Sequence, residues 1–127
     1  MPTLKEHTRA SPREGAVLSK ATIRSAGKLG LPHSLVASIL GLSPATVSRM
    51  AQGTYALKRQ DKAFELAVLL VRLYRSLDAI VGGDEEVARQ WLRSPNAALH
   101  NQPINLIRSV QGLVDVIQYL DSRRAIV

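Results

Sequence analysis

SLVASILGLSPATVSRM, residues 34–50, is the stretch that decides the fold. It reads as two short helices joined by a tight turn, because apolar residues recur at the spacing of a buried helix face on both sides of Gly41. Gly41 can take positive φ where the first helix ends. Ser43 is a good N-cap, and Pro44 suits the first position of the second helix. The stretch is therefore typical of a helix-turn-helix.

The second helix of this pair has a small and polar outer face. Its buried face is supplied by Val47 and Met50, which lie at helical spacing. Such an outer face suits the major groove of DNA, with hydroxyl groups and the helix N-terminus near phosphate. A plain helical hairpin is the alternative. The candidate DNA-binding residues on this face are Ser43, Ala45, Thr46, Ser48, Arg49 and Gln52.

The net charge of +7 lies entirely in the N-terminal half of the chain. Residues 1–62 hold ten Lys and Arg against three acidic residues, whereas residues 63–127 hold seven of each. A helix-turn-helix that binds a polyphosphate is expected to carry such an excess. A basic surface that only aids solubility is the alternative. Lys58 and Arg59, after the second helix, are candidate phosphate contacts or a solvated charge pair.

The composition predicts an all-α protein. Aromatic residues make up only 4% of the chain, so the core must consist mainly of Leu, Val, Ile and Ala. We expect residues 1–10 to form a mobile tail. Residues 11–60 form a helix-turn-helix bundle that binds DNA, beginning with Ser11 as an N-cap, and residues 61–127 form a second, smaller helical domain.

The predicted helix over residues 61–81 is apolar nearly all the way round. A helix of this kind must be covered on most faces. It is therefore expected to join the two halves and to contribute to a subunit interface, as a two-fold dimer on a palindromic site requires. A central core helix in a monomer is the alternative.

Two further helices complete the second half. Asp84 caps one that is expected to bury Val87, Trp91 and Leu92. In the first turn of the last helix stands Gly112, which either allows a close backbone approach or is tolerated near a helix end.

Several classes of protein are not indicated. The chain has no cysteine, and its longest apolar run is six residues, so we expect a cytoplasmic protein that does not span a membrane. Its histidines, His7, His33 and His100, lack acidic companions at metal-ligand spacing. No nucleophile elbow, dinucleotide loop or phosphate loop is present. Neither catalysis nor a cofactor or metal is predicted.

A string of segments in the second half is more diagnostic than the helix-turn-helix. It comprises Arg72–Leu77, Gly82–Gly83, Trp91–Leu99, Pro103–Ile104, Ser109–Leu113 and Tyr119–Leu120. In these segments the chain resembles the toxin-binding domain of the Xre-type antitoxins, members of the bacterial RES/Xre toxin-antitoxin family related to the MbcA and ParS antitoxins. With the Xre-like helix-turn-helix before it, the resemblance covers nearly the whole chain.

The resemblance implies an antitoxin with two working parts. The N-terminal half would bind operator double-stranded DNA of its own operon. Residues 61–127 would dimerise and bind a RES-domain toxin that consumes NAD, blocking access to its active site. A stand-alone helix-turn-helix repressor with a C-terminal dimerisation or sensing domain is the runner-up, and a protein-protein adaptor that no longer binds DNA is a third hypothesis.

The candidate toxin contacts fall in two groups. Trp91, Pro95 and Asn96 surround a helix end, where core packing and a cap are a simpler explanation than toxin contact. In the terminal segment, two arginines precede an apolar tip and could reach a partner's cleft that binds an anionic dinucleotide. A frayed terminus is the alternative. These terminal candidates are Arg123, Arg124, Ile126 and Val127.

Overall fold

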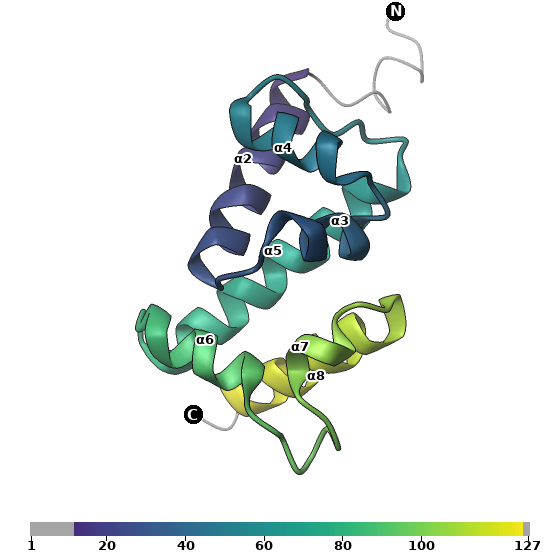
Figure 1. The fold of residues 1–127 in the computed structure, drawn as a ribbon. Coiled ribbons are helices and arrows are strands. Elements are labelled where there is room, and N and C mark those ends of the chain that lie inside the picture. Colours follow the sequence, from purple (N-terminus) through teal and green to yellow (C-terminus); the bar gives the residue numbers. More distant parts are fainter. Residues whose placement is uncertain (1–11, 126–127) are drawn as a thin grey trace, which may run out of the picture.

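The computed structural model describes residues 12–125, which are helical almost throughout (Figure 1). Within this range there is no strand, only one isolated bridge between Asn96 and Asn101. The prediction of an all-α fold is confirmed. Ser11 and the tail before it lie outside the described residues, as do Ile126 and Val127. The helices are α2 (Pro12–Lys28), α3 (His33–Leu40), α4 (Pro44–Gln52), α5 (Lys62–Val81), α6 (Glu85–Arg93), α7 (Pro103–Leu106) and α8 (Val110–Ala125).

The long helix α5 runs between two groups of helices (Figure 1). Helices α2 and α3 pack against α5, and α4 packs against α2 and α3. Helices α6 and α8 pack on α5 as well, with α7 bridging between them. The prediction that this helix joins the two halves is confirmed.

The core is one continuous cluster that crosses both groups. Val36 and Val47 at one end and Leu113 and Val116 at the other are at most 1% exposed. Most apolar faces of α5 are covered within the chain, because its buried residues point toward α2 and α3 as well as α6 and α8. Val68, at 46% exposure, is among the large apolar side chains that remain open to solvent.

The prediction that α6 buries Val87 is wrong. Val87 is 45% exposed, whereas Ala88 and Leu92 are 3% and 0% exposed. Residues four apart share a helix face, so Ala88 and Leu92 face the core together and Val87 lies one position out of phase. Trp91 is half-buried.

Two glycines allow very close backbone contacts. A Cβ atom on Gly112 would overlap the carbonyl oxygen of Leu106, and one on Gly15 would overlap that of Leu57. Of the two explanations for Gly112, the structure supports the close approach. At Gly15, Ser19 stabilises the close contact between α2 and Leu57. Its hydroxyl donates to the Gly15 carbonyl (2.8 Å) and accepts from the Leu57 amide (2.9 Å).

Two arginines of α6 connect the two groups of helices through hydrogen bonds. Arg89 donates from Nε to the Lys28 carbonyl (3.0 Å), and Arg93 donates to the carbonyls of Leu29 (3.2 Å) and Gly30 (2.7 Å). The Lys28 carbonyl ends α2 and the other two lie in the turn that follows it, where carbonyl groups lack helical partners and the helix dipole favours positive charge. We call Arg89 and Arg93 the arginine clamp.

No helix in the described part of the chain is both long and apolar enough to cross a membrane.

Candidate functional site

Helix α4 is held in place by local interactions that its sequence predicts. Ser43 accepts a hydrogen bond from the Thr46 amide (3.1 Å), which makes it the N-cap, and Pro44 follows as the first helical residue. Before it, Gly41 ends α3 with a φ of 70°. Val47 and Met50 are buried, as predicted. The start and the rotation of α4 are thus both fixed.

The predicted DNA-binding residues of α4 lie on one outward face. Thr46 and Ser48 are partly exposed, and the remaining members of the set are exposed. Arg49 donates from Nη2 to the Thr46 hydroxyl (3.1 Å), which lies 2.9 Å from the Ser43 hydroxyl. This chain of three side chains holds the guanidinium over the N-terminal turn. Its hydroxyls and cation form a surface suited to phosphate and base edges.

The two basic residues after α4 differ in their surroundings. Lys58 and Arg59 both lie exposed in the connection to α5. Arg59 forms an ion pair with Glu14 of α2, with Nη1 and Oε2 3.7 Å apart. The pair is exposed on both sides, so it contributes little to stability and leaves the guanidinium accessible.

In the second half, Trp91 and Asn96 have structural partners. The Trp91 ring stacks on Tyr119 of α8, with centroids 6.2 Å apart and planes at 18°. Asn96 accepts a hydrogen bond from the Leu99 amide through Oδ1 (3.1 Å). Pro95 is exposed. Packing therefore explains Trp91 within the chain, and the hydrogen bond to the Leu99 amide explains Asn96. Pro95 remains accessible to solvent.

The end of α8 carries the terminal arginines. Arg123 is exposed and lies one helical turn after Tyr119, hence on the face that meets Trp91. Arg124 donates from Nη1 to the Ser76 hydroxyl (3.2 Å). The structure thus brings Trp91 and Arg123 to one side of α8 and turns Arg124 toward α5.

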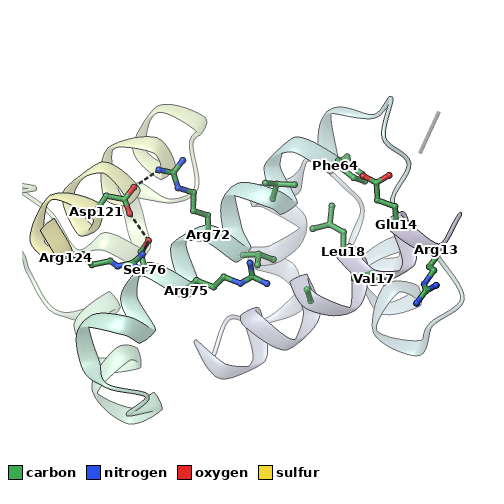
Figure 2. A pocket seen from close by; sticks show the side chains of 13 residues that line it. Arg13, Glu14, Val17, Leu18, Phe64, Arg72, Arg75, Ser76, Asp121 and Arg124 are labelled. Carbon is green, nitrogen blue, oxygen red and sulfur yellow. Dashed lines mark hydrogen bonds and ion pairs between the residues drawn. The ribbon is translucent and has the colours of Figure 1, made fainter. Parts of the chain in front are cut away.

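A polar cluster joins α5 to this end of α8 (Figure 2). The Asp121 carboxylate accepts from the Ser76 hydroxyl (2.8 Å) and from Arg72 Nη2 (2.6 Å). The Ser76 hydroxyl lowers the pKa of Asp121 most, partial burial opposes that shift, and the positive charges of Arg72 and Arg124 lower the pKa further. Sequence reasoning missed Arg72 and Ser76 as partners, because about 45 residues separate them from Asp121.

We expect Asp121→Asn to destabilise the protein at neutral pH and much less in acid. A carboxylate whose pKa is lowered by folding stabilises the folded state above its unfolded pKa of about 3.9, and that contribution is lost as pH falls through the folded pKa. Urea unfolding midpoints at pH 7 and pH 3 test this. Asp115→Asn, on an exposed position of the same helix, is the control. A midpoint difference that does not change with pH would contradict the prediction.

Nowhere between residues 12 and 125 do three His, Cys, Asp or Glu side chains gather closely enough to hold a metal ion.

Comparison with known proteins fits both halves. A family model described as the antitoxin Xre-like helix-turn-helix domain matches residues 8–72, and one described as the antitoxin Xre/MbcA/ParS C-terminal toxin-binding domain matches residues 76–125. The chain belongs to the Xre/MbcA/ParS antitoxin family. It is an antitoxin of a toxin-antitoxin system, with a helix-turn-helix domain and a toxin as its partner.

The antitoxin's fold also matches a solved structure. That structure is described as the crystal structure of the M. tuberculosis MbcT-MbcA toxin-antitoxin complex. The match has a TM-score of 0.64 and 26% sequence identity, and it covers 84% of this chain and 92% of that chain. A search of curated proteins found no match for the antitoxin.

Proposed function

We propose that this antitoxin represses its own operon by binding operator DNA through the outer face of α4. The observation that carries the proposal is the accessible chain of Ser43, Thr46 and Arg49 side chains on a capped helix whose opposite face is buried. The hydroxyls and the helix N-terminus suit phosphate, and Arg49 suits a base edge or a second phosphate. Ala45, Ser48 and Gln52 complete the face, and Lys58 and Arg59 bind the flanking backbone.

Its second activity is to neutralise a RES-domain toxin that consumes NAD. The resemblance of the second half to the RES/Xre antitoxins supports this choice of toxin. In this proposal the region of Trp91, Pro95 and Asn96 docks on the toxin. The terminal segment, with Arg123, Arg124, Ile126 and Val127, closes the entrance to its active site. The antitoxin acts by occupying that entrance, in the cytoplasm, with no catalysis or cofactor of its own.

Self-association is part of the repressor mechanism. Two copies related by a two-fold axis would present two α4 helices to the two halves of a palindromic operator. Large apolar side chains that stay exposed in the single chain, Ile80 and Val87 among them, support the view that it associates.

We expect Arg49→Ala to weaken operator binding about tenfold or more without changing toxin capture. Loss of one good base or phosphate contact costs roughly 1–3 kcal/mol. The measurement is fluorescence anisotropy on DNA from upstream of the antitoxin's own gene, at several salt concentrations, with pull-down of the neighbouring gene's product in parallel. Arg108→Ala, an exposed arginine of the second half, is the matched control.

The outcomes separate the proposed activities. Affinity that falls steeply with added salt supports duplex binding, and flat salt dependence speaks for an adaptor instead. If Arg49→Ala abolished DNA binding and toxin capture together, the division into two working parts would be wrong. NAD consumption by the captured protein, silenced when the antitoxin is added, tests the choice of toxin.

A further inference from the structure

A long groove lies between α2, α5 and the end of α8 (Figure 2). Its volume is about 1320 Å³. It is separate from the outer face of α4 and from the region of Trp91, Pro95 and Asn96, and it shares Arg124 with the terminal segment. Its floor is apolar, contributed by α2 and α5: Val17, Leu18, Ala21, Phe64, Val68 and Val71.

The floor is open to solvent where α2 and α5 face each other. Val17 is 61% exposed and Val68 is 46% exposed. Exposed apolar side chains that line one groove are characteristic of binding surfaces, because leaving them in water costs free energy that a partner recovers. A groove between two packed helices, α2 and α5, is a shape that can receive a third helix.

The rim of the groove is basic. At one end stands Arg13, and at the other stand Arg72, Arg75 and Arg124 (Figure 2). The acidic side chains there already have cationic neighbours: Glu14 pairs with Arg59, and Asp121 with Arg72. The rim thus offers positive charge to an incoming group at both ends.

This charge distribution decides between the candidate occupants. A second copy would bring the same arginines, on a chain of net charge +7, toward one another across the groove. Nucleic acid would satisfy the arginines and leave the valine floor without an apolar partner. An amphipathic helix with acidic flanks satisfies both parts, with its apolar face on the floor and its carboxylates against the guanidinium groups.

We propose that the groove between α2 and α5 binds an acidic amphipathic helix of a protein partner. The helix lies along α2 and α5 with apolar side chains at i, i+3, i+4 and i+7 over Val17 and Val68. Its acidic residues reach Arg13 at one end and Arg75 at the other. This interaction is separate from operator binding by α4 and stands or falls independently of it.

The test uses the full chain and a fluorescein-labelled model helix of about 18 residues, five turns long, with leucines on one face and glutamates on both flanks. Fluorescence anisotropy measures its Kd. A peptide of the same composition in scrambled order removes the apolar face, and a version with lysine in place of glutamate reverses the charge. The chain variants are Val68→Asp, which places a charge on the floor, and Arg75→Glu, which reverses charge on the rim.

We expect the glutamate helix to bind, and each of the two variants to weaken it about tenfold or more. Matched controls are Val110→Asp and Arg108→Glu, an exposed valine and an exposed arginine outside the groove, which leave the affinity unchanged. Arg75 is exposed, so its variant stays folded and informative even if Val68→Asp loses its thermal transition.

Three results would overturn the proposal. Equal binding of the scrambled or lysine peptide would show nonspecific attraction. Equal effects of groove and control variants would place the peptide elsewhere. If analytical ultracentrifugation showed that the chain is a dimer and that Val68→Asp makes it a monomer, the groove would be assigned to a second copy of the chain. Operator binding is measured on the same samples. It remains intact in the first two cases and falls together with the dimer in the third, so the two proposals are judged separately.

Discussion

Gly15→Ala is expected to destabilise the protein by about 1–3 kcal/mol, whereas Gly27→Ala, in the same helix, stabilises it by roughly 0.5–1 kcal/mol. The added methyl at Gly15 collides with the Leu57 carbonyl oxygen, which belongs to backbone and cannot swing away. At Gly27 nothing lies within 4 Å of the added atom, so only the gain in helix propensity remains. The same substitution is thus expected to change the free energy of unfolding in opposite directions at the two positions.

Urea unfolding followed by circular dichroism measures both effects. Because Ser19 and Leu57 share the contact, the Gly15 variant also displaces the connection that carries Lys58 and Arg59. Its affinity for operator DNA is expected to fall more than its loss of stability explains. Equal and small effects of the two substitutions would show that the approach of Leu57 to α2 is looser than the structure has it.

Arg93→Ala is expected to cost about 2 kcal/mol, because it removes charge-assisted hydrogen bonds to the turn that follows α2. The Leu29 and Gly30 carbonyls then lose their guanidinium partner, and the contact between α6 and α2 loosens. The measurement is urea unfolding together with hydrogen exchange. Amide exchange around residues 29–31 accelerates more than exchange within the middle of α5.

Arg108→Ala serves as the control for Arg93→Ala, since it also removes an exposed arginine from the second half. Unchanged unfolding midpoints for both variants would mean that water replaces the clamp without loss. A further comparison is Arg93→Lys, which keeps the charge but not the fork of donors, and is expected to recover only part of the stability.

Local sequence patterns predicted the helix-turn-helix because its determinants are close neighbours. The cap at Ser43, the left-handed Gly41 and the buried Val47 each depend on residues within one or two turns. The same holds for the cap at Asp84, which accepts from the Val87 amide. Helix existence and the orientation of α4 could therefore be predicted from the sequence alone.

Long-range contacts could not be predicted in this way. The arginine clamp joins residues more than sixty positions apart, and nothing in the pattern around Arg89 or Arg93 distinguishes them from solvated charges. Val87 was misplaced for a related reason: a periodic pattern sets which residues share a face, and tertiary packing sets which face is covered. The groove likewise exists only because α2 and α5 lie side by side.

The clamp has a consequence for the engineering of such antitoxins. Exchanging the rear portion of this chain for that of a homologue, with the junction in the Gly82–Gly83 turn, would graft a foreign α6 onto the resident α2 terminus. A chimera would stay well folded only if the donor supplied arginines equivalent to Arg89 and Arg93. Toxin specificity is thus transplanted most safely together with residues 27–30, as one inseparable unit.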